Sequence, residues 1–594
     1  MLEHKKIKAD LLVVGGGLAG LCCAVSAARN GLSVILMHDR SVLGGNASSE
    51  IRMWVCGAHG EHNRETGLIE EIMLENYYRN PTKNYFIWDT VLYGLARAEK
   101  NLTLLLDCAA MDAETEAGDF RDGRTVRIKR VTGYQTTTQI FFDVEATYFA
   151  DCSGDSILAP LTGAHFRIGR EGTDEFSEKT SVKEHDDMTM GMSVMVYGRE
   201  TTGEVRFTPP EWAAKPDAKN YEKRYMGLAD PYENFWYLEL GGDRDAIRDT
   251  EALRDELIGL ALGTWDYVKN RAEAEKAKNW DIDFLGFLPG KRESRRMCGE
   301  YTVTGNDILS GRVFDDTVAY GGWPMDDHYP AGFYRRGAPN KYTHTPSPYT
   351  LPYRALYSEN VENLFFAGRN ISMTHTAMSS ARVMATCALL GEAVGTAASV
   401  AKDFSLTPHG VYLEKIGELQ ERLMRQDVFL PHFSRKVSDI CRLAPLFCGE
   451  SPVTGALLRS GNDREHILCE GTKPASVKAG EALEYRIGKP ARIERVHITF
   501  DSDLDRESFD VSVCEREHSM RANVPLDAPQ FTLPSTLCRS FSLIGTLDGK
   551  STVLFGEENN RKRAYDIPVR GEFDTLTLVP HDAGGTRVIS FDFT

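Results

Sequence analysis

Short apolar tracts and an Ala- and Leu-rich tract alternate at the start of the chain. Ala9–Val14 and Leu32–Met37 are continuous apolar runs of strand length, typical of parallel strands that are buried on both faces. Leu18–Arg29 lies between them and has the composition of a helix. The pattern predicts a strand–helix–strand unit at the beginning of an α/β domain.

A glycine-rich turn joins the first predicted strand to the helix. Gly15, Gly17 and Gly20 stand in GxGxxG register. In such a turn the first glycine allows the tight bend, the second lets the backbone approach a pyrophosphate, and the third lets the helix pack closely on the sheet. The amide N–H groups at the helix start, around Leu18 and Ala19, favour an anion. The turn predicts a dinucleotide site, and an ordinary glycine turn of an α/β protein is the alternative.

The end of the second predicted strand departs from the usual dinucleotide pattern. An Asp or Glu commonly binds the ribose there, but this chain has His38 followed by Asp39 and Arg40. Either Asp39 reaches the ribose after a small shift, which we favour, or His38 binds there itself. A surface histidine at a strand end is the simpler alternative for His38. We include Arg40 among the expected nucleotide contacts.

A second glycine turn, Leu43–Asn46, follows directly. At this point the sequence resembles FAD-dependent oxidoreductases with two dinucleotide-binding domains, in which such a turn lies against the pyrophosphate and flavin. The segment GGNASSEIRM resembles more narrowly the bacterial family called FAD-dependent oxidoreductase, which is distantly similar to fumarate reductase flavoproteins. The resemblance implies FAD as cofactor, with contacts from Gly44, Gly45, Asn46 and Ser49.

Two later blocks extend the resemblance over about residues 9–400. Phe149–Asp155 (FADCSGD) is similar to the second FAD segment of the family, and Asn363–Asn370 (NLFFAGRN) to its closing FAD motif. A glycine-bearing helix follows the closing motif. The resemblance implies further cofactor contacts from Asp151, Gly154, Asp155, Gly368 and Arg369, and it makes Arg382 a candidate for flavin or substrate contact.

The chain divides by composition and by this resemblance. We expect an α/β fold: a Rossmann-like FAD-binding domain, discontinuous over 1–165 and 355–402, with an inserted α+β substrate domain at 166–354. A helical connection is expected at 403–450. From 451 to 594 short alternating or apolar segments are separated by Gly, Pro and Asp turns. That spacing predicts an all-β sandwich, which loosely resembles the galactose-binding-like modules of carbohydrate-active proteins.

Three segments carry candidate chemistry for the reaction. Asn46–Asn63 contains many polar groups, which need partners if they are buried. We expect some of them to face a cavity near the flavin, with His59 as a catalytic candidate, although a solvated loop is the alternative. Lys291–Arg296 (KRESRR) suits a substrate carboxylate, sugar oxygens or an FAD phosphate. A salt-bridged surface strand is the alternative, and we favour a buried role for Arg295 because alternate strand residues face opposite sides.

His375 is the leading candidate for the acid or base. It precedes a predicted helix whose N-terminus, if the resemblance holds, points at the negative end of the flavin. An imidazole pKa suits proton transfer near neutrality, whereas a capping or structural histidine is the alternative. The aromatic, Pro-rich stretch Gly321–Tyr353 is expected either to wall a substrate pocket or to pack across a domain junction.

Composition narrows the class of protein further. The net charge is −17 and the pI about 5.5, which argues against a nucleic-acid partner. Twelve cysteines without a CxxC pair suggest free thiols and no zinc site. We found no apolar run approaching the ~18 residues of a membrane span and no signal-peptide core, so we expect a cytoplasmic protein without a membrane partner.

These features lead to one preferred function and two alternatives. The preferred function is an FAD-dependent oxidoreductase that takes a hydride from a small polar substrate, for which we favour a sugar or polyol. One alternative is cleavage of a glycoside by transient oxidation. The other is a carbohydrate-binding protein whose flavin is structural.

Overall fold

The computed structural model describes residues 2–118, 125–228, 234–453, 457–464, 475–477, 481–506, 509–510, 515–516, 520–527, 530–582 and 585–594. The chain forms two compact units. The first unit comprises Met1–Ala58, Asn80–Ile416 and Glu517–Phe531, and the second comprises His59–Arg79, Gly417–Arg516 and Thr532–Thr594.

A seven-stranded sheet is the centre of the first unit. Its order is β3-β2-β1-β6-β5-β4, and β18 also pairs with β6. The strands are β1 (His4–Val14), β2 (Val34–Met37), β3 (Leu102–Leu105), β4 (Cys108–Ala117), β5 (Val126–Gln135), β6 (Ile140–Asp151) and β18 (Leu364–Phe366). Strands β3, β2, β1, β6 and β18 run parallel, while β4, β5 and β6 form an antiparallel meander. The predicted Rossmann-like sheet is confirmed, and β18 joins it from far along the chain.

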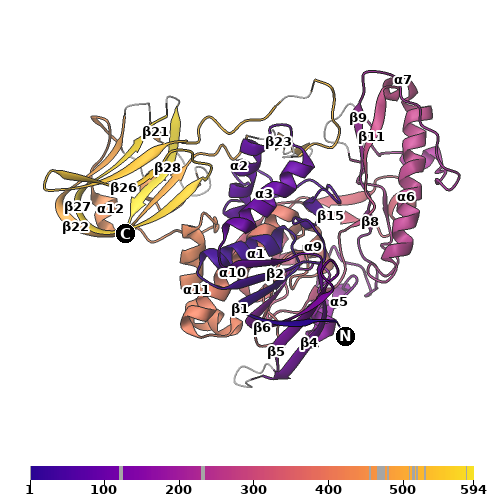
Figure 1. Cartoon of the computed structure of the whole chain (residues 1–594), viewed down its shortest axis with the longest axis horizontal. Helices are drawn as coiled ribbons and strands as arrows, with labels where there is room; N and C mark the ends of the chain where they lie inside the picture. The colour runs from indigo at the N-terminus through magenta and orange to yellow at the C-terminus, as the bar shows by residue number, and fades with distance from the viewer. Residues whose placement is uncertain are drawn as a thin grey trace. The chain divides into compact units, whose positions relative to one another are not determined.

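Two apolar helices pack together beside this sheet. Helix α1 (Leu18–Arg29) follows β1, and helix α10 (Met384–Phe404) comes from the other end of the unit (Figure 1). A Cβ atom on Gly391 would lie 2.0 Å from the carbonyl oxygen of Ala19, and one on Gly395 would lie 2.3 Å from that of Cys23. The helices therefore touch backbone to backbone. Contrary to the expectation from sequence, helix α10 is long and apolar enough to cross a membrane by length and composition. Its apolar window is 94% buried in the protein, as in a core helix.

Small antiparallel sheets surround the remaining core of the first unit. They pair as β10-β8-β12, β11-β9, β13-β7, β14-β17 and β15-β16. Their strands are β7 (Phe166–Arg167), β8 (Met192–Ser193), β9 (Val196–Glu200), β10 (Glu239–Leu240), β11 (Trp280–Leu285), β12 (Gly290–Lys291), β13 (Arg296–Met297), β14 (Thr317–Gly321), β15 (Met325–His328), β16 (Asn340–Thr343) and β17 (Tyr349–Pro352). The helices are α3 (Tyr85–Ala98), α4 (Leu158–Thr162), α5 (Thr173–Phe176), α6 (Thr250–Tyr267), α7 (Ala274–Ala277), α8 (Gly305–Ser310) and α9 (His375–Ala381), and α11 (Pro408–Arg425) spans the boundary between the units. This mixture confirms the expected α+β character of the middle of the chain.

The second unit is built on an eight-stranded antiparallel sheet, drawn largely in yellow in Figure 1. Its strands are β19 (Leu446–Cys448), β20 (Ser451–Pro452), β21 (Ala475–Val477), β22 (Leu483–Phe500), β25 (Phe541–Leu547), β26 (Lys550–Glu557), β27 (Ala564–Pro580) and β28 (Thr586–Phe593), with a separate pair β23 (Phe509–Asp510) and β24 (Glu515–Arg516). Strand β22 pairs with both β27 and β28, and aromatic and aliphatic side chains fill the core. The predicted all-β character is confirmed.

An early segment of the chain belongs to this second unit. Helix α2 (Leu68–Arg79) contributes Leu74 to its core, and helix α12 (Asp439–Leu443) contributes Cys441. The fully buried Glu70 of α2 accepts a hydrogen bond from Ser502 (2.6 Å) and pairs with Arg506 (2.8 Å). Because breaking a buried pair leaves an unpaired charge that is expensive, this contact fixes α2 to the unit.

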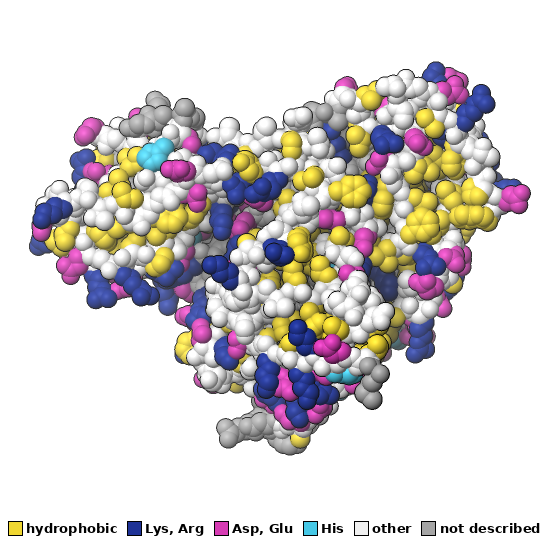
Figure 2. Space-filling view, viewed as in Figure 1, with side chains coloured by type: hydrophobic (Ala, Val, Ile, Leu, Met, Phe, Trp, Pro, Cys, Tyr) yellow, Lys and Arg dark blue, Asp and Glu magenta, His cyan; other side chains and the backbone are white. Residues whose placement is uncertain are grey.

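Charges of both signs are intermixed on the face shown in Figure 2. On the meander of the first unit, Glu114 of the edge strand β4 lies 3.0 Å from Lys129 and 3.1 Å from Arg130 of β5. Exposed pairs of this kind contribute little stability. Charged side chains on an edge strand do, however, discourage it from pairing with another chain.

Substituting Gly391 tests the close approach of α10 to α1. The Gly391→Val protein should lose about 1–3 kcal/mol of unfolding free energy, because its Cβ meets main-chain atoms that cannot move aside cheaply. Urea unfolding measures this, with Gly94→Ala on α3 as the control, since a Cβ on Gly94 has open space around it. Equal stability of Gly391→Val and wild type would contradict the packing.

Candidate functional site

The start of α1 is built to leave main-chain amides available. Gly17 precedes the helix, and within the described residues no side chain caps it and its first turn carries no acidic residue. Gly15 has φ +102°, and a Cβ there would lie 2.5 Å from Cys152; a Cβ on Gly20 would lie 1.8 Å from the oxygen of Gly15. A Cβ on Gly17 would meet only the Cα of Gly45, at 3.8 Å. The packing of the fold therefore requires Gly15 and Gly20, whereas the space at Gly17 would admit a side chain.

Two other predicted glycine segments converge on the same helix start. Gly44 forms a parallel bridge with Gly17, and a Cβ on Gly45 would lie 3.0 Å from the Cα of Gly17. Gly368 has φ +111°, and a Cβ on it would lie 3.4 Å from the Cβ of Ala19. The three blocks that were matched in sequence thus meet at one point, where α1 presents its amides.

Asp155 ties several of the predicted residues together. Its carboxylate lies 2.8 Å from both Lys291 Nζ and Arg369 Nη2, and it accepts from Ser294 Oγ at 2.7 Å. Burial acts to raise the pKa of Asp155, but the charges of Arg369 and Lys291 lower it to about 2. Asn46 donates to the Lys291 carbonyl oxygen at 3.0 Å.

This junction also leaves polar atoms for a ligand. In the described part of the chain, the buried Arg369 Nε and Asn370 Oδ1 make no hydrogen bond. Gly154, with φ +75°, stands where a Cβ would lie 2.7 Å from Arg369 Nη1. Arg369 Nε as a donor and Asn370 Oδ1 as an acceptor suit a hydrogen-bonding cofactor with anionic groups.

The other predicted nucleotide contacts have protein partners of their own. His38 Nδ1 accepts from the Gly16 amide (3.0 Å), and its Nε2–H donates to the Val42 carbonyl oxygen (3.1 Å). Asp39, whose side chain is 67% exposed, remains accessible for a ribose. The remaining contacts are Arg40 Nη1 to Glu50 (3.5 Å), the Ser49 amide to Asp89 (3.0 Å), and Asp151 to the Ser153 and Leu158 amides (3.0 and 2.8 Å).

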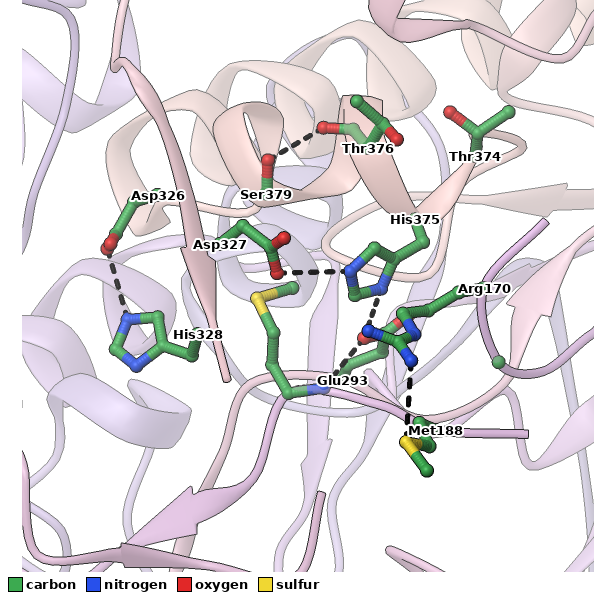
Figure 3. Close-up of polar contacts among 12 residues, drawn as sticks. Arg170, Met188, Glu293, Asp326, Asp327, His328, Thr374, His375, Thr376 and Ser379 are labelled. Carbon is green, nitrogen blue, oxygen red and sulfur yellow. Dashed lines mark hydrogen bonds and ion pairs between the residues drawn. The ribbon is translucent and has the colours of Figure 1, made fainter. Parts of the chain in front are cut away.

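His375 lies between two carboxylates. Its Nδ1–H donates to Glu293 Oε2 at 2.8 Å and its Nε2–H to Asp327 Oδ1 at 3.2 Å (Figure 3). Glu293 is fully buried, whereas the Asp327 side chain is 40% exposed. Burial acts to lower the pKa of His375, but the two carboxylates outweigh it and raise the pKa to about 10. The expectation that His375 titrates near neutrality is therefore wrong: the ring is an imidazolium at pH 7.

A second histidine repeats the arrangement. His328 Nε2 lies 3.2 Å from Asp326 Oδ2 (Figure 3), and its Nδ1 lies 2.6 Å from Glu239 Oε2. Arg382 Nη2 pairs with the same Asp326 oxygen at 3.2 Å. Arg382, which we predicted to contact the flavin or the substrate, is therefore bonded to the carboxylate that also contacts His328. Arg292 Nη1 lies 3.6 Å from Glu239. Within the described ranges, no group of three His, Cys, Asp or Glu side chains is arranged to hold a metal ion.

The N-terminus of α9 is already bonded to protein groups. The His375 amide donates to Glu171 Oε2 at 2.8 Å, and the Ala377 amide donates to Thr374 Oγ1 at 3.2 Å. Thr374 in turn donates to the buried Glu178 at 2.8 Å. We expected the N-terminus of this helix to point at the flavin with its amides available. The first amide is instead bonded to the Glu171 carboxylate.

The prediction of a buried Arg295 is wrong. Its side chain is partly exposed, donates to the Asp155 carbonyl oxygen at 3.0 Å and lies over the Phe166 ring. Arg292 and Arg296 are the buried arginines instead. The alternation argument fails because the segment forms only the two-residue strands β12 and β13, with irregular backbone between them. The catalytic role of Arg295 stays a prediction.

His59 belongs to the second unit, where its carbonyl oxygen accepts from Asn63 Nδ2 at 2.9 Å, and its catalytic role stays a prediction. Sequence reasoning missed the carboxylates that hold the two histidines: Glu239, Glu293, Asp326 and Asp327. The Asp-Asp-His run on β15 was the available signal, since three titratable residues in a row on a strand place side chains on both of its faces.

A family model described as FAD dependent oxidoreductase matches residues 10–423, well over half of the chain. The chain belongs to this family. The amides at the start of α1, the bare Gly17 backbone and the unpartnered Arg369 and Asn370 atoms fit the FAD that the description of this family names.

Individual relatives are more distant. A glycerol-3-phosphate dehydrogenase of Mycobacterium leprae (strain TN) is 36% identical over 66 residues, which is 11% of this chain and 11% of that protein. The anhydrotetracycline hydroxylase OxyS from Streptomyces rimosus is 13% identical, with 71% of this chain and 66% of that chain covered and a TM-score of 0.31. A geranylgeranyl bacteriochlorophyll reductase-like protein from Thermoplasma acidophilum is 12% identical, with 71% and 85% covered and a TM-score of 0.30. The chain spans about a ninth of the length of the curated relatives it matches.

The Gly17→Ala protein separates folding from cofactor binding. The apoprotein should melt as wild type does, because the added Cβ makes only ordinary contacts. Its FAD affinity should fall about tenfold or more, equivalent to ~1.4 kcal/mol, since the methyl group stands where the pyrophosphate approaches the backbone. Fluorescence titration of apoprotein with FAD measures this. Unchanged affinity would show that the pyrophosphate binds elsewhere.

The pKa of His375 makes stability depend on pH in a defined direction. Its pKa rises from 6.5 in the unfolded chain to about 10 in the folded protein. The stabilisation is complete below pH 6.5, declines as the pH rises and is lost through about pH 10. The difference in unfolding free energy between wild type and His375→Gln should therefore shrink between pH 6.5 and 10. A constant difference over this range would rule out the charged state.

Proposed function

We propose that the enzyme takes a hydride from a C–H bond of a small polar substrate, and that this substrate is a sugar or polyol. The observation that carries the proposal is the Glu293–His375–Asp327 chain. Its central residue, His375, is the first residue of α9 and follows shortly after the closing FAD motif, Asn363–Asn370. Bound FAD supplies the hydride acceptor, and the residues described below handle the substrate and its proton.

The chain of three groups is suited to take up one proton. With His375 protonated and both carboxylates ionised, the group carries one net negative charge. Asp327 is its accessible end, and burial acts to raise the Asp327 pKa, but the hydrogen bond from His375 keeps it lowered. When the carbon of a substrate alcohol loses a hydride, its hydroxyl group must also lose a proton. Asp327 is the residue that accepts this proton. His375 orients that carboxylate, and Glu293 holds His375 from behind.

Aromatic side chains near the second histidine, His328, support a sugar or polyol. Trp54 and Trp323 belong to one buried cluster, against which the partly buried Trp236 packs. Trp236 meets the His328 ring edge-on at 5.4 Å between centroids. Aromatic faces bind the C–H faces of sugar rings, while carboxylates such as Asp327 accept hydrogen bonds from their hydroxyl groups.

Anaerobic mixing with a panel of aldoses, polyols and glycosides tests the proposal. At least one compound should bleach the oxidised flavin spectrum. The Asp327→Asn and His375→Ala proteins should keep the yellow colour, but bleach about 10²–10⁴-fold more slowly. Asp187→Asn, on a side chain that is 95% exposed, is the matched control and should bleach at the wild-type rate.

The same experiment separates the alternatives. Release of an aglycone from a glycoside without a consumed electron acceptor would favour cleavage by transient oxidation. Absence of bleaching with every compound would favour a carbohydrate-binding protein with a structural flavin. Wild-type bleaching rates in Asp327→Asn would remove this carboxylate from the reaction.

A further inference from the structure

Two consecutive residues of β15 each meet a histidine. Asp327 accepts from His375, and Asp326 lies 3.2 Å from His328 Nε2. The side chains of Asp326 and Asp327 leave the strand on opposite sides (Figure 3), as strand geometry requires. Each histidine is held from behind by a glutamate of at most 2% exposure, Glu293 or Glu239.

The second group is enclosed by further contacts. Arg292 Nη1 donates to Ser193 Oγ at 2.8 Å and Nη2 to the Trp236 carbonyl oxygen at 3.1 Å, and the guanidinium faces Glu239. Arg292 and Glu293 are adjacent in the chain. One short segment therefore supplies the glutamate of the first group, Glu293, and the arginine that pairs with the glutamate of the second group, Glu239. From the other side, Arg382 pairs with Asp326, and Asn340 of β16 donates to it.

Strand β15 depends on such anchors. Among the described residues it pairs with β16 alone, over Met325–His328 and Asn340–Thr343, and a two-stranded ribbon needs packing contacts to be stable. The direction of the Asp327 carboxylate therefore depends on side-chain contacts outside the ribbon. Those on the Asp326 side are buried and numerous, whereas Asp327 itself is part exposed.

We propose that His328 is a positioning residue: the Glu239–His328–Asp326 group fixes β15 so that Asp327 is presented to His375 and to the substrate. This inference rests on the proposed function for its catalytic meaning. It also makes a claim about the protein alone, because the contact between Asp327 and His375 exists without substrate.

The charged groups around the two histidines set the conditions of the test. Those that face His375 are Glu293 and Asp327 directly, Glu171 at its amide, and Arg296 through Glu171 and Glu293. Glu178 and the Arg170–Asp186 pair are further charges near it. Those that face the second histidine are Glu239, Asp326, Arg292 and Arg382, and Asp327 also interacts with it electrostatically.

The test is the pH titration of His375 in the full-length FAD-bound protein, followed by NMR of ¹³C-labelled histidine rings. The His375→Gln protein identifies the resonance. In His328→Gln the midpoint of His375 should fall by about one pH unit or more, because an opposite charge within hydrogen-bonding distance contributes about that much. The matched control is His409→Gln, which removes a histidine that lies 2.6 Å from Glu300; its His375 midpoint should stay at the wild-type value.

The outcomes distinguish positioning from a merely structural role. A folded His328→Gln protein with an unchanged His375 midpoint would overturn the proposal. If that variant does not fold, Asp326→Asn keeps the shape of the group and is held to the same criterion. No substrate or turnover enters the measurement, so a failure here is separate from a failure of the proposed reaction.

Discussion

The close packing of α10 on α1 is the constraint on which the site depends. Gly391 and Gly395 let the two backbones touch at Ala19 and Cys23. Helix α1 carries the glycine turn at its start, and α10 directly follows α9, which begins at His375. Since β18 is also paired with β6, the segment from β18 to α10 is fixed at both ends. The position of His375 is thereby tied through α10 to α1 and to the glycine turn that is expected to bind the cofactor.

Buried charge is the second theme of the site. A carboxylate or cation removed from water is costly unless it is paired and hydrogen-bonded. Here Asp155, Glu239 and Glu293 each have cationic partners. Hydrogen bonds that involve charged groups are strong and directional, so these pairs fix the direction of each side chain. The arrangement leaves Asp327 as an ionised group with access to solvent, which is where chemistry with a polar substrate is possible.

Sequence reasoning succeeded where the signal is local. The run Ala9–Val14 lies within β1, and Leu18–Arg29 coincides with α1, because apolar periodicity and glycine spacing act within a few residues. The glycine turns could also be recognised, since a backbone that must approach a ligand or another backbone has few alternatives to glycine. The family resemblance then joined blocks that are far apart in the chain.

The same reasoning failed where the structure depends on contacts between distant segments. The partners of His375 come from residues 293 and 327, and no period in the sequence links them. Arg295 was placed by a strand alternation that the short strands β12 and β13 do not sustain. The elevated pKa of His375 likewise follows from two carboxylates brought together only by the fold.

A crystal structure of the FAD complex tests the central claim most directly. The account predicts pyrophosphate oxygens about 3 Å from the amides at the start of α1, and a flavin ring that faces the Asp327 carboxylate with room for a substrate between them. A pyrophosphate bound away from α1, or a flavin ring separated from Asp327 by protein, would contradict it.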